Sequence, residues 1–270
     1  MLVSDRPRPA PPDPPVLVRD PTVRITSIVL LLIAAAAWAD VIRSSREGPD
    51  MMMTMFMPPT VADALVFVAS WGVMMAAMML PSALPMIRLY GATLRGDAAT
   101  TPRALAIAAF TLVYLAVWTA SGAPVYLAHT GLMALSPRAF AYGVATALLA
   151  AGVFQLSSLK RRCLRVCRSP LGFLLGHWRA GLRGSLALGG WHALYCLGCC
   201  WALMIVLVAA GAMGLAWVLL ITAVVAAEKL LPAGEWTARV TGGAFLLLGT
   251  VVFLHPDLVT ALRAGHLMSM

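Results

Sequence analysis

Three cysteines within five residues, Cys196, Cys199 and Cys200, lie inside an otherwise apolar stretch of the chain. The stretch, 187–210, is long enough to cross a bilayer, where ligating side chains are rare and usually functional. A single buried cysteine behaves as a small apolar residue. Three thiols, with His192 one helical turn before the first, instead indicate soft-metal ligation or thiol redox chemistry. On a helix these four side chains fall within an arc of about 100°.

Two further cysteines, Cys163 and Cys167, lie in the strongly basic segment 160–168. If the segment is helical, they are one turn apart and share a face. Nearby cations lower the pKa of a thiol and favour the thiolate, the form that binds metal and attacks disulfides. All five cysteines of the chain lie within 163–200, which favours one local site over a spread disulfide framework.

Methionines form a third group of soft side chains. Thioether sulfur is a poor ligand for zinc but a good one for Cu(I), although methionine also fills apolar cores. Two prolines, Pro81 and Pro85, follow these methionines, so the helix that carries them should kink or end just beyond. The methionines form two i, i+4 pairs, Met74 with Met78 and Met75 with Met79.

A separate methionine-rich run precedes this helix. We expect it on the outer side of the membrane, either as a weak copper-capture segment or as an interfacial apolar loop. The run comprises Met51, Met52, Met53, Met55 and Met57.

The elements that must position these residues are transmembrane helices. The chain is 61% hydrophobic and only 11% charged, with a mean hydropathy of +0.86, whereas soluble domains carry about 25% charged residues. An all-α, polytopic helical bundle of about seven spans is therefore expected, since the pattern lacks the alternating short strands of a closed barrel. The apolar segments are 25–42, 61–80, 104–121, 139–158, 186–210, 213–231 and 238–255.

Basic residues predict the orientation of this bundle. With the amino terminus in the cytoplasm and the carboxyl terminus in the periplasm, all of the 20 lysines and arginines fall inside except Arg43, Arg46, Arg138 and Arg263, as the positive-inside rule requires. The basic charge is thereby explained without nucleic acid. Residues 1–21 form a Pro-rich disordered tail, 22–258 the membrane domain and 259–270 a short periplasmic tail. The first span is read as a retained anchor, with a cleaved signal peptide as the alternative.

This topology brings the soft ligands to one level, in the inner half of a bacterial inner membrane. Polar residues at the same depth are expected around the site. Glu228 pairs with Lys229 or with a loop arginine, or joins the site. The expected surrounding residues are Gln155, Lys160, Glu228 and Lys229.

The order of these motifs resembles a known family, the bacterial predicted metal-binding integral membrane proteins (domain of unknown function 2182). The resemblance spans about 71–229 and implies metal binding. It is carried by Met78-Met79-Leu80-Pro81, Cys163 with Cys167, Cys196-Leu197-Gly198-Cys199-Cys200-Trp201 and Glu228-Lys229. One position departs from the family pattern: Gly214 stands where an asparagine is expected.

Three functions remain open from the sequence. The first is a copper-handling membrane protein that delivers, transports or stores Cu(I), with zinc as the alternative metal and a metallochaperone or cuproenzyme as partner. The second is a membrane thiol–disulfide oxidoreductase. The third is a structural subunit that packs against another membrane protein through small residues. Because no nucleophile–base set, P-loop or dinucleotide motif is found, we expect no catalytic residues.

Overall fold

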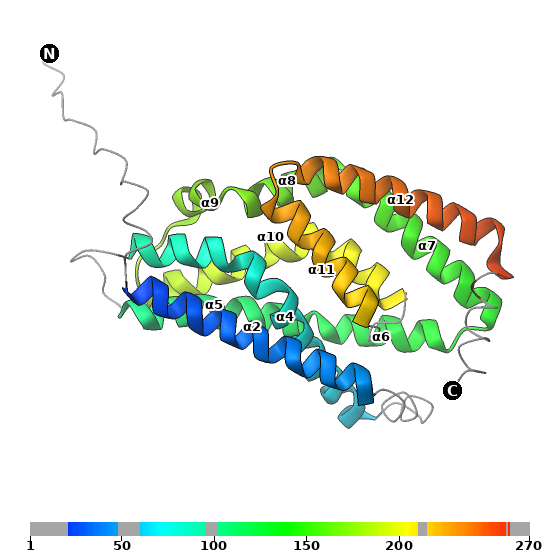
Figure 1. Ribbon diagram of the computed structural model, residues 1–270, viewed down its shortest axis with the longest axis horizontal. Helices are drawn as coiled ribbons and strands as arrows, with labels where there is room; N and C mark the ends of the chain where they lie inside the picture. Colours follow the sequence, from blue (N-terminus) through cyan, green and yellow to red (C-terminus); the bar gives the residue numbers. More distant parts are fainter. Residues whose placement is uncertain (1–20, 48–59, 95–101, 210–214, 258, 260–270) are drawn as a thin grey trace, which may run out of the picture.

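The computed structural model describes residues 21–47, 60–94, 102–209, 215–257 and 259. These residues form helices, and no strand occurs among them (Figure 1). The helices are α2 (Pro21–Glu47), α4 (Val61–Thr93), α5 (Arg103–Ala120), α6 (Gly122–Met133), α7 (Pro137–Leu156), α8 (Ser158–Arg168), α9 (Pro170–His177), α10 (Gly181–Ala209), α11 (Leu215–Leu230) and α12 (Gly234–Leu254).

Six segments in the described part of the chain are long and apolar enough to cross a membrane: Pro21–Arg46, Val61–Thr93, Arg103–Met133, Pro137–Leu156, Gly181–Ala209 and Gly234–Leu254. The protein is thus a multi-pass helical membrane protein. The predicted span 213–231 corresponds to α11, whose 16 described residues fall short of that length. The sides on which the termini lie stay a prediction. The predicted tails 1–21 and 259–270, except Pro21 and residue 259, and the Met51–Met57 run lie outside the described residues.

Of the two outcomes expected at Pro81 and Pro85, a kink or an end of the helix, α4 shows the kink. It continues through Pro81 and Pro85 to Thr93 and bends partway along its length (Figure 1). Proline removes a backbone donor from the helix and frees a carbonyl one turn before it. Ser82 lies between the two prolines, and its hydroxyl donates a hydrogen bond to the carbonyl of Met79 at 2.9 Å. The helix therefore kinks without ending.

The basic segment forms a helix of its own, separate from α7. Ser157 has an extended backbone (φ −70°, ψ 157°) that ends α7, and its hydroxyl accepts a hydrogen bond from the N–H of Lys160 at 3.1 Å. This N-cap starts α8 in a new direction. The prediction that Cys163 and Cys167 lie one turn apart on a helix is confirmed.

Close helix packing sets the position of α10, which carries the three clustered cysteines. A Cβ added to Gly189 would lie 2.4 Å from the carbonyl oxygen of Phe110 on α5, so glycine lets the two backbones approach. Helices α7 and α12 pair in the same way, since a Cβ on Gly152 would lie 2.9 Å from the carbonyl oxygen of Gly242. Helix α11 lies between these groups and packs on α4, α8, α10 and α12.

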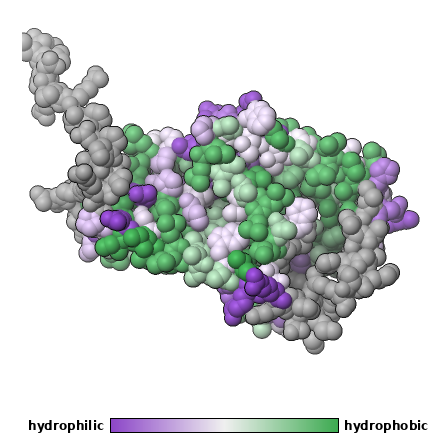
Figure 2. Space-filling model, viewed as in Figure 1, coloured by the Kyte–Doolittle hydropathy of each residue, from purple (hydrophilic) through white to green (hydrophobic). Residues whose placement is uncertain are grey.

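The surface and the interior divide as a membrane protein requires. Many large apolar side chains, such as Leu32, Leu112 and Leu247, are exposed, and apolar residues cover much of the described surface in Figure 2. Lipid can solvate such a surface, whereas water would not. The core instead holds long thioether and aromatic side chains, with Met75 and Trp118 both fully buried.

Candidate functional site

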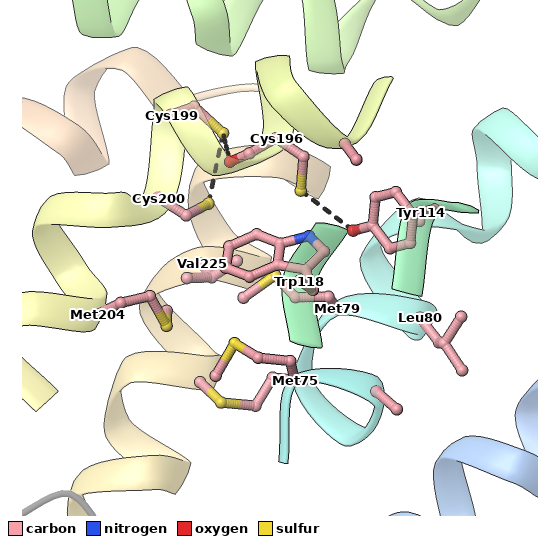
Figure 3. Packing of buried hydrophobic residues seen from close by; sticks show 14 of the residues in the cluster. Met75, Met79, Leu80, Tyr114, Trp118, Cys196, Cys199, Cys200, Met204 and Val225 are labelled. Carbon is pink, nitrogen blue, oxygen red and sulfur yellow. Dashed lines mark hydrogen bonds between the residues drawn. The ribbon is translucent and has the colours of Figure 1, made fainter. Parts of the chain in front are cut away.

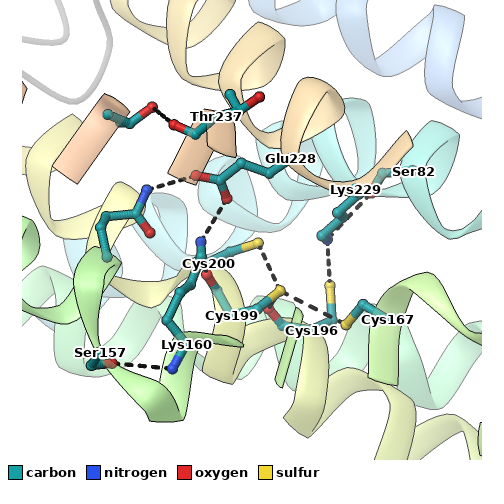
Figure 4. Close-up of polar contacts among 12 residues, drawn as sticks. Ser82, Ser157, Lys160, Cys167, Cys196, Cys199, Cys200, Glu228, Lys229 and Thr237 are labelled. Carbon is teal, nitrogen blue, oxygen red and sulfur yellow. Dashed lines mark hydrogen bonds and ion pairs between the residues drawn. The ribbon is translucent and has the colours of Figure 1, made fainter. Parts of the chain in front are cut away.

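The three clustered cysteines all face the interior of the bundle. Cys196, Cys199 and Cys200 are each exposed by 1% or less. Cys199 is the central thiol: its Sγ lies 3.3 Å from that of Cys200 and 3.8 Å from that of Cys167 on α8 (Figure 4). Sulfurs that are 32 residues apart in the sequence therefore meet at the interface of α8 and α10.

These thiols form a chain of neighbours. The Cys199 thiol donates a hydrogen bond to the carbonyl of Cys196 at 3.1 Å. Within the described residues, no three histidine, cysteine, aspartate or glutamate side chains converge so as to hold a metal ion. A metal–thiolate bond is about 2.3 Å long, so two sulfurs as far apart as about 4.6 Å can share one ion. Both Cys199 contacts are within this span.

Cys163 is the thiol nearest the protein surface. It is partly exposed and faces Gly198 on α10, where an added Cβ would lie 3.2 Å from its sulfur. Burial raises the pKa of the Cys163 thiol, and the Lys160 ammonium offsets only part of that shift. The expectation that the basic segment lowers this pKa is therefore wrong. Two of the four arginines of α8, Arg162 and Arg165, are exposed.

An ammonium group links the thiols to the methionines of α4. Lys229 donates to the Sγ of Cys196 at 3.0 Å, and its Nζ also lies 3.8 Å from the Sδ of Met79 and 3.4 Å from the hydroxyl of Ser82. The side chain is mostly buried. A buried cation in a membrane interior needs anionic or polar partners. Here its partners are sulfur and hydroxyl groups, which places the Lys229 ammonium directly beside the thiols.

Glu228 has a different partner from those expected. Its carboxylate lies 2.6 Å from the ammonium of Lys160 and accepts a hydrogen bond from the amide of Gln155 at 2.6 Å. Lys160 also donates to the carbonyl of Cys199 at 2.5 Å. Glu228 thus pairs neither with Lys229 nor with a loop arginine. The Lys160–Glu228 pair instead ties α8 and α11 to the backbone of α10 beside the central thiol.

The four methionines of α4 that the sequence singled out are all buried. Figure 3 shows the side chains of Met75 and Met79 across from the cysteines, with the indole of Trp118 between the two groups. The hydroxyl of Tyr114, on the same helix as Trp118, is hydrogen-bonded to the thiol of Cys196 at 3.1 Å. The relative exposures are 3% for Met74, 0% for Met75, 2% for Met78 and 0% for Met79.

His192 is surrounded by aromatic rings rather than by sulfur. Its imidazole stacks on Tyr114 with ring centroids 5.5 Å apart, and it contacts Phe110 and Phe173. Its Nδ1 is buried without a hydrogen-bond partner among the described residues. His192 therefore stacks on the ring of Tyr114, and the hydroxyl of Tyr114 in turn contacts the thiol of Cys196. Tyr114 thus lies between the imidazole and that thiol.

Four residues in this region were missed by sequence reasoning: Tyr114, Trp118, Met204 and Ser82. The first two had a signal, because Phe110, Tyr114 and Trp118 recur every four residues within an apolar span and so share a helix face. All three are fully buried. Met204 likewise follows Cys196 and Cys200 at four-residue spacing on α10.

Comparison with known proteins gives one match. The model of the PpoB2 family, described as a copper chaperone, matches residues 68–252, a region that contains every cysteine of the chain. This family carries a different name from the one that the sequence motifs suggested, and it is copper-related. No curated protein and no solved structure matches the chain.

Proposed function

Because the chain belongs to the PpoB2 copper chaperone family, we propose that it binds Cu(I) as cargo at a sulfur site in the inner half of the membrane. The ligands are the thiols of Cys196, Cys199 and Cys200, with Cys167 on α8. Cys163 and the α4 methionines lie around these thiols and are not required to hold the ion. The observation that carries this proposal is the meeting of three thiols around Cys199, whose sulfur lies 3.8 Å from that of the partly buried Cys167 and 3.3 Å from that of the fully buried Cys200.

The groups around the thiols support copper over zinc. Zinc is held by four thiolates or by thiolates with imidazole, so the thiols alone suit either metal, and here Glu228 is held by Lys160 and His192 by aromatic rings. The other close group is the thioether of Met79, which suits Cu(I). Sulfur is thus the ligand type that this region offers.

The charge of Lys229 supports a bound metal–thiolate complex. Two thiolates and one Cu(I) carry a net charge of −1, which is unfavourable in an apolar interior unless a cation is near. The ammonium 3.0 Å from Cys196 supplies that cation. The loaded site would then be close to neutral.

The family and the fold support a cellular role in copper transfer. We place the protein in a bacterial inner membrane, where it passes copper to or from another copper protein. The exposed arginines Arg162 and Arg165 on α8, next to the partly exposed Cys163, would suit an acidic copper-carrying partner, because opposite charges speed encounter.

The experiment is elemental analysis of protein purified from membranes in detergent under reducing conditions. We expect copper to co-purify with the wild type and to be lost from the C196S/C199S/C200S variant. The C163S variant is the matched control, because this thiol contacts no other sulfur among the described residues; it should keep most of the metal. Equal copper content in the wild type and the triple variant would refute the proposal.

One distance favours a second function, thiol–disulfide exchange. The Cys167 and Cys199 sulfurs lie on different helices only 3.8 Å apart, so a disulfide between them requires a small movement. Its formation would release two protons and two electrons, which a membrane quinone could accept. Alkylation of the thiols before and after quinone addition tests this: a redox protein loses the Cys167 and Cys199 adducts, whereas a copper carrier keeps them.

A further inference from the structure

The soft side chains continue along α10 beyond the cysteines. Cys196, Cys200 and Met204 follow one another at four-residue spacing, so they lie on nearly one face of the helix. Each step advances about 6 Å along the axis. Met204 is 3% exposed and lies in the same core as the thiols. Figure 3 shows its thioether on the far side of Trp118 from Cys196.

Helix α4 carries two further buried thioethers, those of Met75 and Met79. Met79 is close to Cys196, because the Lys229 ammonium contacts the sulfur atoms of both residues. Met75, one turn before Met79, is also fully buried. In Figure 3 its side chain lies on the same side of Trp118 as Met204, away from the cysteines.

Trp118 lies between the thiols and these thioethers. It is fully buried, and its indole Nε1 has no hydrogen-bond partner among the described residues. A buried indole normally finds a partner for its N–H, so the position of Trp118 is not explained by a hydrogen bond within the described residues. Its electron-rich ring face is what this position offers, and that face attracts a desolvated cation.

We infer that Met75, Met79 and Met204, with the ring of Trp118, form a second and weaker site for a monovalent soft cation, which receives the ion from the thiols. This inference rests on the proposed function and adds a step to it. Thioethers are neutral and leave the charge of Cu(I) uncompensated, so this site should fill after the thiolates. No electrons are transferred: the ion exchanges thiolate ligands for thioether ligands.

The test is a titration of the full-length protein in detergent with Ag(I), a soft monovalent ion that does not change oxidation state. We expect two bound equivalents in the wild type, one tight and one weak. The M75L/M204L variant should lose the weak equivalent and keep the tight one. Leucine conserves volume and polarity, so folding should survive; M75L and M204L alone serve if the double variant does not fold. M86L, at another buried methionine of α4, is the matched control and should bind like the wild type.

Tryptophan fluorescence gives an independent readout. The chain has eight tryptophans, and we expect the second equivalent to quench emission in the wild type but not in W118F. One bound equivalent in the wild type, unchanged in M75L/M204L, would overturn the second site and leave the thiol site standing. If the C196S/C199S/C200S variant still binds both equivalents, the thiol site is refuted. The M75L/M204L variant then still tests the second site by itself.

Discussion

The ammonium of Lys160 and the carboxylate of Glu228 form an ion pair of 2.6 Å in which both side chains are shielded from solvent. The pair connects α8 to α11, and its second contact, with the carbonyl of Cys199, connects both to α10. A buried pair of this kind holds helices in a fixed register, since moving either partner would strand a charge in an apolar medium. It therefore fixes where Cys167 and Cys199 meet.

Removing one member of this pair should destabilise the protein more than removing both. We expect K160M to lower the free energy of unfolding by about 3–5 kcal/mol, because Glu228 is left buried and unpaired. K160M/E228L should recover much of that loss. Thermal unfolding in detergent measures both, with R162M, at an exposed position of the same helix, as the control. A K160M protein as stable as the wild type would contradict the structural role of the pair.

Replacing Lys229 should weaken copper binding if its ammonium neutralises the loaded thiols. We expect K229M to reduce Cu(I) affinity at least tenfold, equivalent to about 1.4 kcal/mol, whereas K229R keeps the positive charge and most of the affinity. Competition against a chelator of known affinity measures this difference. Tighter binding by K229M would mean that the ammonium competes with the metal for Cys196.

Two adjacent glycines on α10 should respond differently to alanine. G189A places a Cβ 2.4 Å from the carbonyl oxygen of Phe110, so α10 must move away from α5, and we expect a loss of about 1–3 kcal/mol. At Gly190 the nearest atom is a Val113 methyl at 3.5 Å, an ordinary contact. G190A should therefore be neutral or stabilising, since alanine favours a helix. Melting temperatures in one detergent compare the two; equal temperatures would argue against this packing.

The reactivity of Cys163 should show the raised pKa of its thiol. Burial disfavours the thiolate, so a smaller fraction is ionised at neutral pH than in a free thiol, and alkylation should be slow at pH 7. The alkylation rate should keep rising with pH beyond about 8.5, which is the ordinary pKa of a thiol. The measurement uses C167S, in which Cys163 is the remaining partly exposed cysteine, with N-acetylcysteine as the reference. Alkylation of Cys163 at the reference rate at pH 7 would show that the arginines dominate.

The helices and the faces of the soft side chains were predictable because both depend on short-range periodicity. Apolar length predicts a membrane helix, and spacing predicts that Cys196, Cys199 and Cys200 share a face. The prolines predicted a kink or an end in α4, and the sequence left this choice open because it depends on the neighbouring helices that pack against α4. The break between α7 and α8 lies at Ser157, which caps the start of α8. The sequence did not indicate this break, because a serine becomes a cap only where the preceding helix ends.

The pairing of charged and aromatic residues was not predictable. Glu228 and Lys229 are adjacent in the chain, yet one contacts Lys160 and the other Cys196, because neighbouring residues on a helix point about 100° apart. The helix that each of these side chains contacts depends on how the rigid helices rotate and slide against one another when they pack. The same packing places Trp118 between thiols and thioethers. Spans and sulfur-bearing faces are properties of single segments, whereas the site is a property of the contacts among five helices.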